Sequence, residues 1–443
     1  MSSKQTMQNQ SVNNEVAALR YLEAADRIGY TLCRDAIWSG DRCNWLGWVM
    51  DAVGHSYQPV YMACPPLLYN GVAGIGLFLA QLVSFTNDRH QLAILHGAIK
   101  QLLATSSTLD HPETFGYYTG LSGVAHSLVR IGELTQMQEV IDTGISLLSN
   151  PNLKAETPIT DVLSGYAGSI VALIDVAERQ GKPELIETAK YQGELLLKLA
   201  TEDENGMWWG SPISPKGLTG YSHGVAGIGL AFLELNRVAA DARFVNAAKG
   251  AFKFERKAFN TQIGNWPDYR PDPTNPSTEP RYSDTWCNGA TGIGLSRLRA
   301  AQLLTQDDEI LSEINAAIKV TTSTLMSMPL QPTIDFSYCH GIASHAEFLL
   351  EAGHQYDRSD LIAMAESVAA NGIRFYHQSG LPWQCGVPGA GETPSFMLGT
   401  AGIGYFYLRL YNYEAVPSVL ILQPNGTGKT SSAITPAASS IEA

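Results

Sequence analysis

Charged residues are scarce in this sequence of 443 residues, and positive ones are the scarcer kind. Only 16% of the chain is charged, with 29 Lys and Arg against 42 Asp and Glu, which gives a formal net charge of −13. This balance argues against a nucleic-acid-binding surface and against attachment to an anionic membrane surface. Since 45% of the residues are hydrophobic, much of the chain is expected to be interior, as in a protein whose helices are buried on more than one side.

Long apolar runs and paired cysteines are also missing. No uninterrupted apolar stretch reaches the roughly 20 residues of a membrane span, so no span is expected. The six cysteines show no paired spacing, and the polar N-terminus has no apolar core of a secretory signal. These absences predict a cytoplasmic protein without a disulfide framework. Residues 1–15 are polar and residues 424–443 are rich in Ser, Thr, Ala, Gly and Pro, so both ends are predicted to be disordered around one domain, 16–423.

A glycine-marked turn, Gly-x-x-Gly followed by an apolar run, recurs along that domain. The first glycines of its seven copies are Gly71, Gly120, Gly165, Gly224, Gly289, Gly341 and Gly399, spaced 45 to 65 residues apart. The run after each turn is apolar almost all round, as in a doubly buried helix, whereas intervening segments such as 88–103 are amphipathic. The pattern predicts an all-α fold, an α/α toroid of seven helix-turn-helix units, each with an outer helix, a turn and an inner helix. Strand signals are weak, at most a minor hairpin within 265–283.

Glycine at the start of each inner helix allows positive φ and close backbone approach. All the turns are then expected at one end of the ring, where helix N-termini present free N–H groups to a developing anion. The polar side chains near the turns should therefore surround one mouth of the toroid. Among them are Asp161, His223, Cys287, Cys339 and His340.

Cys287, Cys339 and His340 carry the donor atoms that zinc prefers. Two thiols and one imidazole would leave a fourth tetrahedral position open, which is typical of a catalytic site. The competing interpretation is that these are ordinary buried residues, since free cysteine often acts as a small hydrophobe. Their shared setting beside equivalent turns favours a metal site.

Three blocks of the sequence support a family resemblance that spans about residues 20–422. The chain resembles the lanthionine synthetase C-like (LanC-like) zinc cyclases in Tyr221-Ser-His223-Gly-Val-Ala-Gly-Ile, in Trp286-Cys287-Asn-Gly and in Cys339-His340-Gly341. Within that family it looks most like the cyclase half of class II lanthipeptide synthetases, judged by Leu68-Tyr69-Asn-Gly and Val416-Pro417-Ser-Val-Leu.

The resemblance implies an α/α toroid that holds one zinc ion through Cys287, Cys339 and His340, with His223 and Asp161 as acid/base candidates. Two positions depart from the family. Many stand-alone cyclases have Arg four residues before the zinc Cys, but position 283 here is Ser and the nearest arginine is Arg281; and Asn288 stands where Tyr or His is common. The dehydratase half of class II enzymes is not in this sequence, so a separate dehydratase is expected.

The chemistry that these residues predict is a thioether-forming cyclisation. A substrate cysteine would take the open zinc position and lose its proton there at neutral pH. It would then attack the β-carbon of a dehydroalanine or dehydrobutyrine in the same dehydrated precursor peptide. His223 is the candidate acid for the resulting enolate, with Asp161 positioning or activating a group nearby, and helix N-termini and Arg281 could stabilise the enolate charge.

Other interpretations stay open at this stage. Asp161 is also a favoured helix or turn cap, and His223 could bond only to its own turn. The whole protein could be a non-cyclising LanC-like zinc protein that binds or adds glutathione or another thiol. A zinc prenyltransferase-like enzyme is disfavoured, because it needs a basic cluster for a diphosphate and none is found near the predicted mouth.

Overall fold

The structure is a computed structural model that describes residues 3–53, 56–109, 111, 114–211, 214, 216–270, 279–304, 307–328 and 331–424. Only the backbone is described for residues 3–17, 52, 53, 56 and 57. Residues 425–443 of the predicted C-terminal tail lie outside these ranges.

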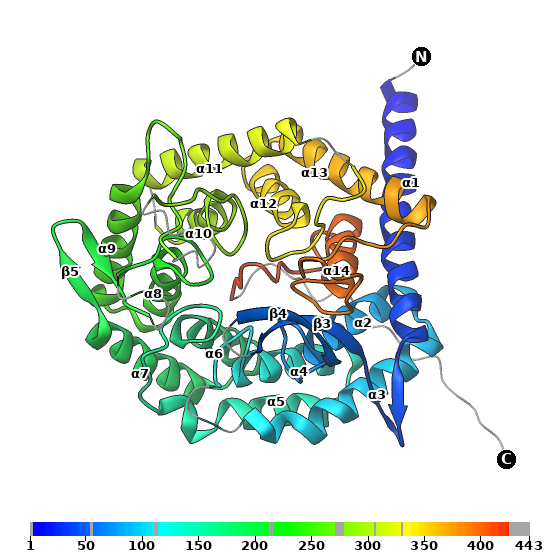
Figure 1. Cartoon of the computed structure of the whole chain (residues 1–443), viewed down its shortest axis with the longest axis horizontal. Helices are drawn as coiled ribbons and strands as arrows, with labels where there is room; N and C mark the ends of the chain where they lie inside the picture. The colour runs from blue at the N-terminus through cyan, green and yellow to red at the C-terminus, as the bar shows by residue number, and fades with distance from the viewer. Residues whose placement is uncertain are drawn as a thin grey trace.

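Helices form two concentric rings, as Figure 1 shows. Over the described residues, the inner ring consists of seven helices, α2 Val72–Thr86, α4 Leu121–Thr135, α6 Tyr166–Gln180, α8 Val225–Ala239, α10 Ala290–Leu303, α12 Ile342–Gln355 and α14 Thr400–Tyr411. The outer ring consists of α1 Ser3–Arg34, α3 Arg89–Thr105, α5 Gln138–Leu148, α7 Pro183–Leu199, α9 Ala242–Ala258, α11 Asp308–Ser327 and α13 Ser359–Gly372. Short helical turns are η1 Ser106–Leu109, η2 Pro151–Lys154 and η3 Ile373–Gln378. The predicted α/α toroid is confirmed.

Burial follows the two hydrophobic patterns of the sequence. Every residue of α2 from Val72 to Leu82 is buried, and so is every residue of α10 from Ala290 to Ala300, because an inner helix packs on both sides. The outer helix α9 buries one face only, with Phe244, Ala248 and Phe252 among its buried residues. Each inner helix therefore belongs to one continuous core that runs around the ring.

The helix pairs are arranged differently from the prediction in two respects. Each inner helix from α2 to α12 packs mainly against the outer helix that follows it, through links as short as Asn87 and Asp88 between α2 and α3, and less against the one before it. The N-terminal helix α1 packs against α14 and so completes the outer ring. Residues 3–15, which were predicted to be disordered, form the start of α1; they contain neither Gly nor Pro and continue directly into the helix that α14 binds.

Three small antiparallel hairpins occur in the described chain, none of them foreseen from the sequence. They are β1 Ile37–Ser39 with β2 Arg42–Asn44, β3 Leu46–Val53 with β4 Ser56–Ala63, and β5 Thr201–Asp203 with β6 Gly206–Trp208. In the loop where a minor hairpin was expected, the described residues form isolated bridges, Asn260 with Asn265 and Asp268 with Arg281.

The turns before the inner helices are joined to one another by a closed circle of backbone hydrogen bonds, which we call the turn girdle. Each member stands two residues before the first glycine of its turn, donates its N–H to the next member and accepts from the previous one, with N···O distances of 2.8 to 3.3 Å. Within the described residues the circle runs through Ser222, Cys287, Cys339, Met397, Tyr69, Tyr118, Leu163 and back to Ser222. The prediction that all the turns lie at one end of the ring is thus confirmed.

The glycines of the repeat are needed for space more than for positive φ. Of the first glycines, only Gly289 has positive φ, at 98°, among the N-cap residues of the inner helices in the described chain. A Cβ on the second glycine would meet the carbonyl oxygen of the residue six positions earlier. At Gly292 that atom is Trp286 O at 2.0 Å, and at Gly402 it is Phe396 O at 1.8 Å.

Gly402→Ala is therefore expected to lower the free energy of unfolding by about 1–3 kcal/mol, the usual cost of overpacking a close contact. Gly391→Ala is the matched control, because a Cβ at Gly391 would have no atom within 4 Å. Denaturant unfolding of both variants measures the difference. Equal stability of the two variants would contradict the steric explanation.

The C-terminal segment after α14 crosses the centre of the ring (Figure 1). Its carbonyls are held from the inner wall: Tyr118 Oη donates to Val419 O at 2.7 Å, and Trp286 Nε1 donates to Leu420 O at 2.8 Å. Val416, Leu420 and Ile421 are at most 1% exposed. The segment thus fills the bore beneath the girdle. Within the described ranges, none of the helices combines the length and the apolar character that crossing a bilayer requires.

Candidate metal centre and active site

The donor atoms of Cys287, Cys339 and His340 lie within 4.8 Å of one another at the mouth of the ring. Cys339 is 5% exposed, whereas the His340 side chain is 37% exposed, so the cluster faces solvent on one side only. This separation is what one small ion bound by two sulfurs and one nitrogen requires. The structure therefore brings together all three predicted metal-ligating residues.

The local fold explains why two cysteines 52 positions apart meet. Both belong to the turn girdle, at equivalent positions of adjacent turns, and Cys287 N donates to Cys339 O at 3.3 Å. The preceding residue, Trp286, is fully buried and is anchored below by Leu420 O and by edge contacts with Tyr118 and Tyr221. Trp286 thus fixes the turn from beneath and leaves Cys287 at the mouth.

The ring of His340 is held in place through one of its two nitrogens. Its Nε2 lies 2.8 Å from Gly386 O and 3.6 Å from Asp335 Oδ2, so Nε2 carries the proton and donates it. Nδ1 is then left with its lone pair. A backbone carbonyl or carboxylate that accepts the second ring N–H is the usual support of a metal-bound histidine. The residues present therefore fit a divalent metal, and this donor set suits zinc.

The Cys339 thiol affects the ionisation of Cys287. The adjacent Cys339 and then burial raise the pKa of Cys287 well above its usual range, while the positive charge of Arg270 and the Thr285 hydroxyl act in the opposite direction. Without a cation, two neighbouring buried thiolates would repel one another. A cation between them removes that cost, which is a second reason to assign a metal to this cluster.

Two neighbouring hydroxyls contact the sulfurs directly. Tyr69 Oη donates to Cys339 Sγ at 3.0 Å, and Thr285 Oγ1 lies 3.3 Å from Cys287 Sγ. In the sequence, Tyr69 was only part of the family resemblance, and this contact was not predicted. A signal was available, because Tyr69 stands two residues before Gly71, the same position that Cys287 and Cys339 hold in their own turns.

His223 and Asp161 come from the next two turns of the ring and are directly bonded. His223 Nδ1 lies 2.6 Å from Asp161 Oδ2, while Asp161 Oδ1 accepts the N–H of Ser164 at 2.8 Å. Ser222, the girdle residue before His223, donates to Cys287 O. Asp161 therefore both caps its turn and contacts His223. A capping role and a positioning role of Asp161 are thus compatible with each other. The catalytic roles of both residues stay predictions.

Two arginines flank the buried carboxylate of Asp268. Arg270 bonds to it through Nε and Nη2, the latter at 2.8 Å, and its charge acts on both Cys287 and Cys339. Arg281 lies 3.8 Å from Asp268 Oδ2, and its side chain is half exposed. Sequence reasoning missed Arg270 because it selected the arginine nearest to Cys287 in the chain. The role assigned to Arg281 remains a prediction, and Arg270 is a further candidate for it.

The profile of a family described as lanthionine synthetase C-like protein matches residues 64–421. The chain belongs to this family. A curated relative, the lacticin 481/lactococcin biosynthesis protein LcnDR2 of Lactococcus lactis subsp. lactis, is 22% identical over 387 residues. That match covers 84% of this chain but only 38% of the relative. Among solved structures, a nisin cyclase is similar with a TM-score of 0.60 and 18% identity, covering 78% of this chain and 89% of that one. The resemblance and fold inferred from the sequence are confirmed.

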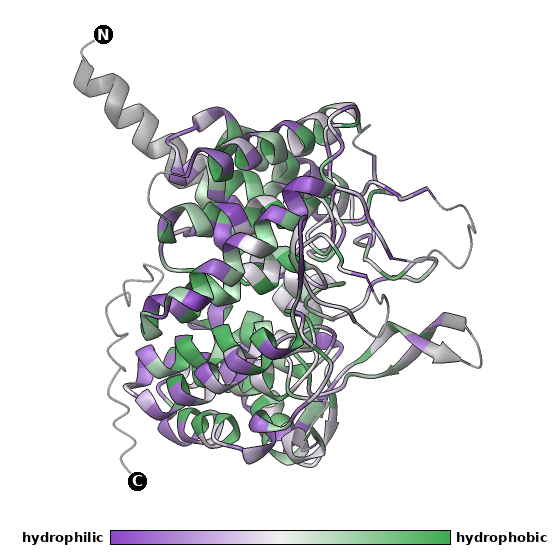
Figure 2. Cartoon of the chain, turned by 90° about the vertical axis from the view of Figure 1, so that its left-hand side faces the viewer, coloured by the Kyte–Doolittle hydropathy of each residue, from purple (hydrophilic) through white to green (hydrophobic). Residues whose placement is uncertain are grey.

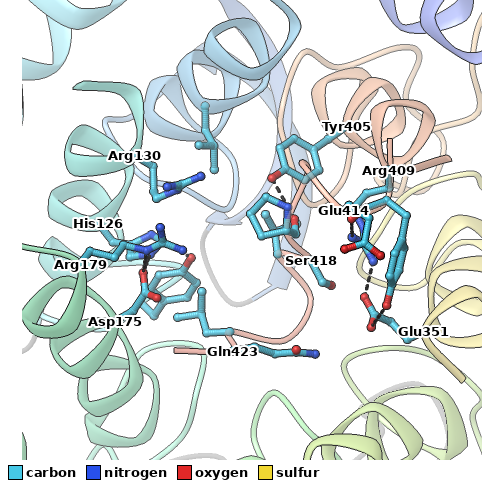
Figure 3. Close-up of a pocket in the computed structure, with 16 residues that line it drawn as sticks. His126, Arg130, Asp175, Arg179, Glu351, Tyr405, Arg409, Glu414, Ser418 and Gln423 are labelled. Atoms are coloured by element: carbon cyan, nitrogen blue, oxygen red, sulfur yellow. Dashed lines mark hydrogen bonds and ion pairs between the residues drawn. The ribbon is translucent and has the colours of Figure 1, made fainter. Parts of the chain in front are cut away.

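Beside the C-terminal segment, the bore of this LanC-like toroid contains a cavity, which is shown in Figure 3. Its lining comes from the C-terminal segment and from later turns of the inner helices, and none of the three predicted metal-ligating residues belongs to it. His126 Nε2 and Arg179 Nε both bond to Asp175, and Arg409 pairs with Glu351. These buried charges already have partners, so we interpret the ion pairs around the cavity as structural. Removing one member would leave a buried charge uncompensated.

Proposed function

We propose that this chain is a lanthipeptide cyclase, which adds a cysteine thiol of a dehydrated peptide to a dehydroalanine or dehydrobutyrine of the same peptide. The observation that carries the proposal is the convergence of Cys287, Cys339 and an oriented His340 at the mouth of the ring. The bonded pair of His223 and Asp161 on the adjacent turns supplies an acid/base group. The product is a lanthionine or methyllanthionine thioether ring.

The relatives support this function. Membership of the lanthionine synthetase C-like family and the printed role of LcnDR2 in lacticin biosynthesis both favour thioether chemistry on a peptide. The chain spans little more than a third of LcnDR2, so the activities of that whole protein are not transferred here. A dehydrating activity must act first on the precursor, and a separate dehydratase remains the proposed source.

Zinc is the proposed metal, held by Cys287 and Cys339 through sulfur and by His340 through Nδ1. When bound, it would lower the pKa of a substrate thiol at the open position and keep that sulfur nucleophilic. Tyr69 and Thr285 help to set the charge on the two protein sulfurs, since hydrogen bonds to ligands tune a metal site. Six free cysteines in the described chain fit a reducing compartment, and we propose the cytoplasm.

The protein's own acid completes the addition. As the carbon–sulfur bond forms, the alkene electron pair moves onto the carbonyl oxygen and gives an enolate. Asp161 accepts the Nδ1 proton of His223, so Nε2 is the nitrogen free to deliver a proton to the α-carbon. Arg270, whose charge already acts on the cysteine cluster, is placed to favour negative charge at this mouth.

Mass spectrometry of a dehydrated peptide with one cysteine tests the proposal. Ring closure leaves the peptide mass unchanged but removes the thiol, so the product should resist a thiol-alkylating reagent after incubation with the zinc-loaded protein. The same reaction with added glutathione separates the main alternative, because glutathione transfer would increase the mass by one adduct. Adduct formation without ring closure would overturn the cyclase proposal in favour of thiol addition.

A further inference from the structure

The hairpin β3–β4 has one edge that no other strand covers. Cys64 N donates to Trp45 O at 2.8 Å, so the pair Trp45 and Cys64 exchanges hydrogen bonds across the hairpin. In an antiparallel ladder, hydrogen-bonded pairs alternate with non-hydrogen-bonded pairs, and the residues of a non-hydrogen-bonded pair point their backbone N–H and C=O groups outward. From the register, Tyr61 and Ala63 on β4 and Trp48 on β3 therefore present their N–H and C=O groups to the outside.

The two edges of the hairpin differ. On β3, the outward N–H and C=O of Trp48 are both satisfied by the hydroxyl of Thr393, at 3.1 Å each. On β4, the outward groups of Tyr61 and Ala63 have no hydrogen-bond partner within the described part of the chain. Proteins usually protect such an edge with charges, because an unpaired edge accepts further strands. Between Leu46 and Ala63 the sole Asp, Glu, Lys or Arg is Asp51.

One face of the hairpin is also apolar and exposed. Successive side chains of a strand point to opposite faces, and paired residues point to the same face, so Leu46, Trp48, Met50 and Tyr61 lie on one side of the hairpin. Tyr61 is 55% exposed and packs its ring 5.0 Å from that of Trp48, while Leu46 is 41% exposed. A strand added beside β4 would therefore find backbone partners at the edge and apolar surface for alternate side chains.

The hairpin leads directly to the metal cluster. Ala63 ends β4 six residues before Tyr69, whose hydroxyl contacts Cys339 Sγ. Thr393, which holds β3, is four residues before Met397, the girdle residue that accepts from Cys339 N. Figure 2 shows the hairpin projecting from the same side of the ring as the long loops that precede the inner helices. The family match begins at residue 64, so the hairpin lies outside it.

We propose that the β4 edge binds an extended segment of the peptide substrate as a third strand, and so holds the peptide while another part of it reaches the metal cluster. This inference rests on the proposed cyclase function. An extended chain spans at most about 3.3–3.6 Å per residue, so the bound segment must be separated from the reacting cysteine by enough residues to reach from the β4 edge to the metal cluster. The backbone of the substrate supplies the hydrogen bonds, and an uncharged, partly apolar segment fits the face.

The test replaces an outward N–H with proline, which an edge strand tolerates because its inner ladder stays intact. Tyr61→Pro is expected to raise the KM for a long dehydrated peptide about tenfold, equivalent to about 1.4 kcal/mol, with kcat unchanged. Met50→Pro is the matched control, since Met50 points its N–H to the opposite edge of the same hairpin and pairs with the natural Pro59. A short dehydrated peptide that contains only the ring-forming segment should react equally with all three proteins.

Three outcomes would overturn the docking proposal. The first is an unchanged KM of Tyr61→Pro for the long peptide, and the second is an equal rise in Met50→Pro. The third is a concentration-dependent dimer of the natural protein that Tyr61→Pro abolishes, which would assign the edge to a second copy. Ala63→Pro provides an independent edge variant if Tyr61→Pro does not fold. Fluorescence anisotropy of the labelled long peptide measures binding directly, so the docking result stands apart from a failure to close rings.

Discussion

Cys287→Ala and Cys339→Ala proteins are each expected to lose tight zinc binding and, with it, ring formation. Each change removes one of the three ligands and leaves a site that can no longer enclose the ion. Zinc measured after purification should fall from about one ion per chain to a small fraction of that. Ring formation on the dehydrated peptide should fall by several orders of magnitude, because the substrate thiol is no longer activated.

The matched control is Cys33→Ala. Cys33 is a free cysteine that is 5% exposed in the hydrophobic core and lies on α1, on the outer ring. The same chemical change there should cost some stability through a small cavity but leave zinc content and ring formation intact. Full zinc retention in both ligand variants would disprove the ligand assignment, and zinc loss in Cys33→Ala would show that thiol removal acts through folding.

Much of the fold and the metal cluster could be predicted because a repeated unit fixes both. Once the glycine turns are recognised as equivalent, Cys287 and Cys339 must occupy matching places, two residues before Gly289 and Gly341. The turn girdle supplies the missing physical link, since it bonds matching places of adjacent turns to one another. The ligand cluster is thus a consequence of ring closure, and the sequence pattern contains that information.

The features that the sequence did not predict depend on contacts between distant segments. Residues 3–15 continue into the helix that packs on α14, and their polar composition does not reveal this continuation. Arg270 approaches the thiols because Asp268 holds its guanidinium, and nothing in local spacing selects it over Arg281. The outer edge of β3 is bonded at Trp48 by the hydroxyl of Thr393, more than 300 residues away, and no local pattern reveals that contact.

The girdle also separates two kinds of residue at the mouth. Residues two positions before the glycine have both backbone groups engaged, so their side chains project from a rigid circle; Cys287, Cys339 and Tyr69 are of this kind. Residues one position before the glycine, such as His223 and His340, stand beside it and are oriented by side-chain partners instead. Substitution of a residue one position before the glycine should therefore leave the turn girdle intact.

His223→Ala is accordingly expected to retain zinc and to bind the dehydrated peptide while closing rings more slowly. A positioned acid or base usually contributes about 10²–10⁴-fold, so the rate should fall by a factor of that order. Zinc content, peptide binding and ring formation are measured on the same preparation. Reaction in D₂O adds a further reading, because protonation by water in place of His223 should scramble the configuration at the new α-carbon.

Two variants separate proton delivery from turn geometry. Ser222→Ala removes the hydroxyl that lies 3.1 Å from Cys287 O but keeps His223, so it should close rings at nearly the natural rate if His223 acts as an acid. Asp161→Asn keeps an oxygen to cap the N–H of Ser164 but weakens the orientation of His223, so its rate should lie between those of the natural protein and His223→Ala. If His223→Ala closes rings at the rate of the natural protein and with the same product configuration, His223 is only a structural partner of Asp161. If His223→Ala loses zinc, His223 belongs to the metal site instead.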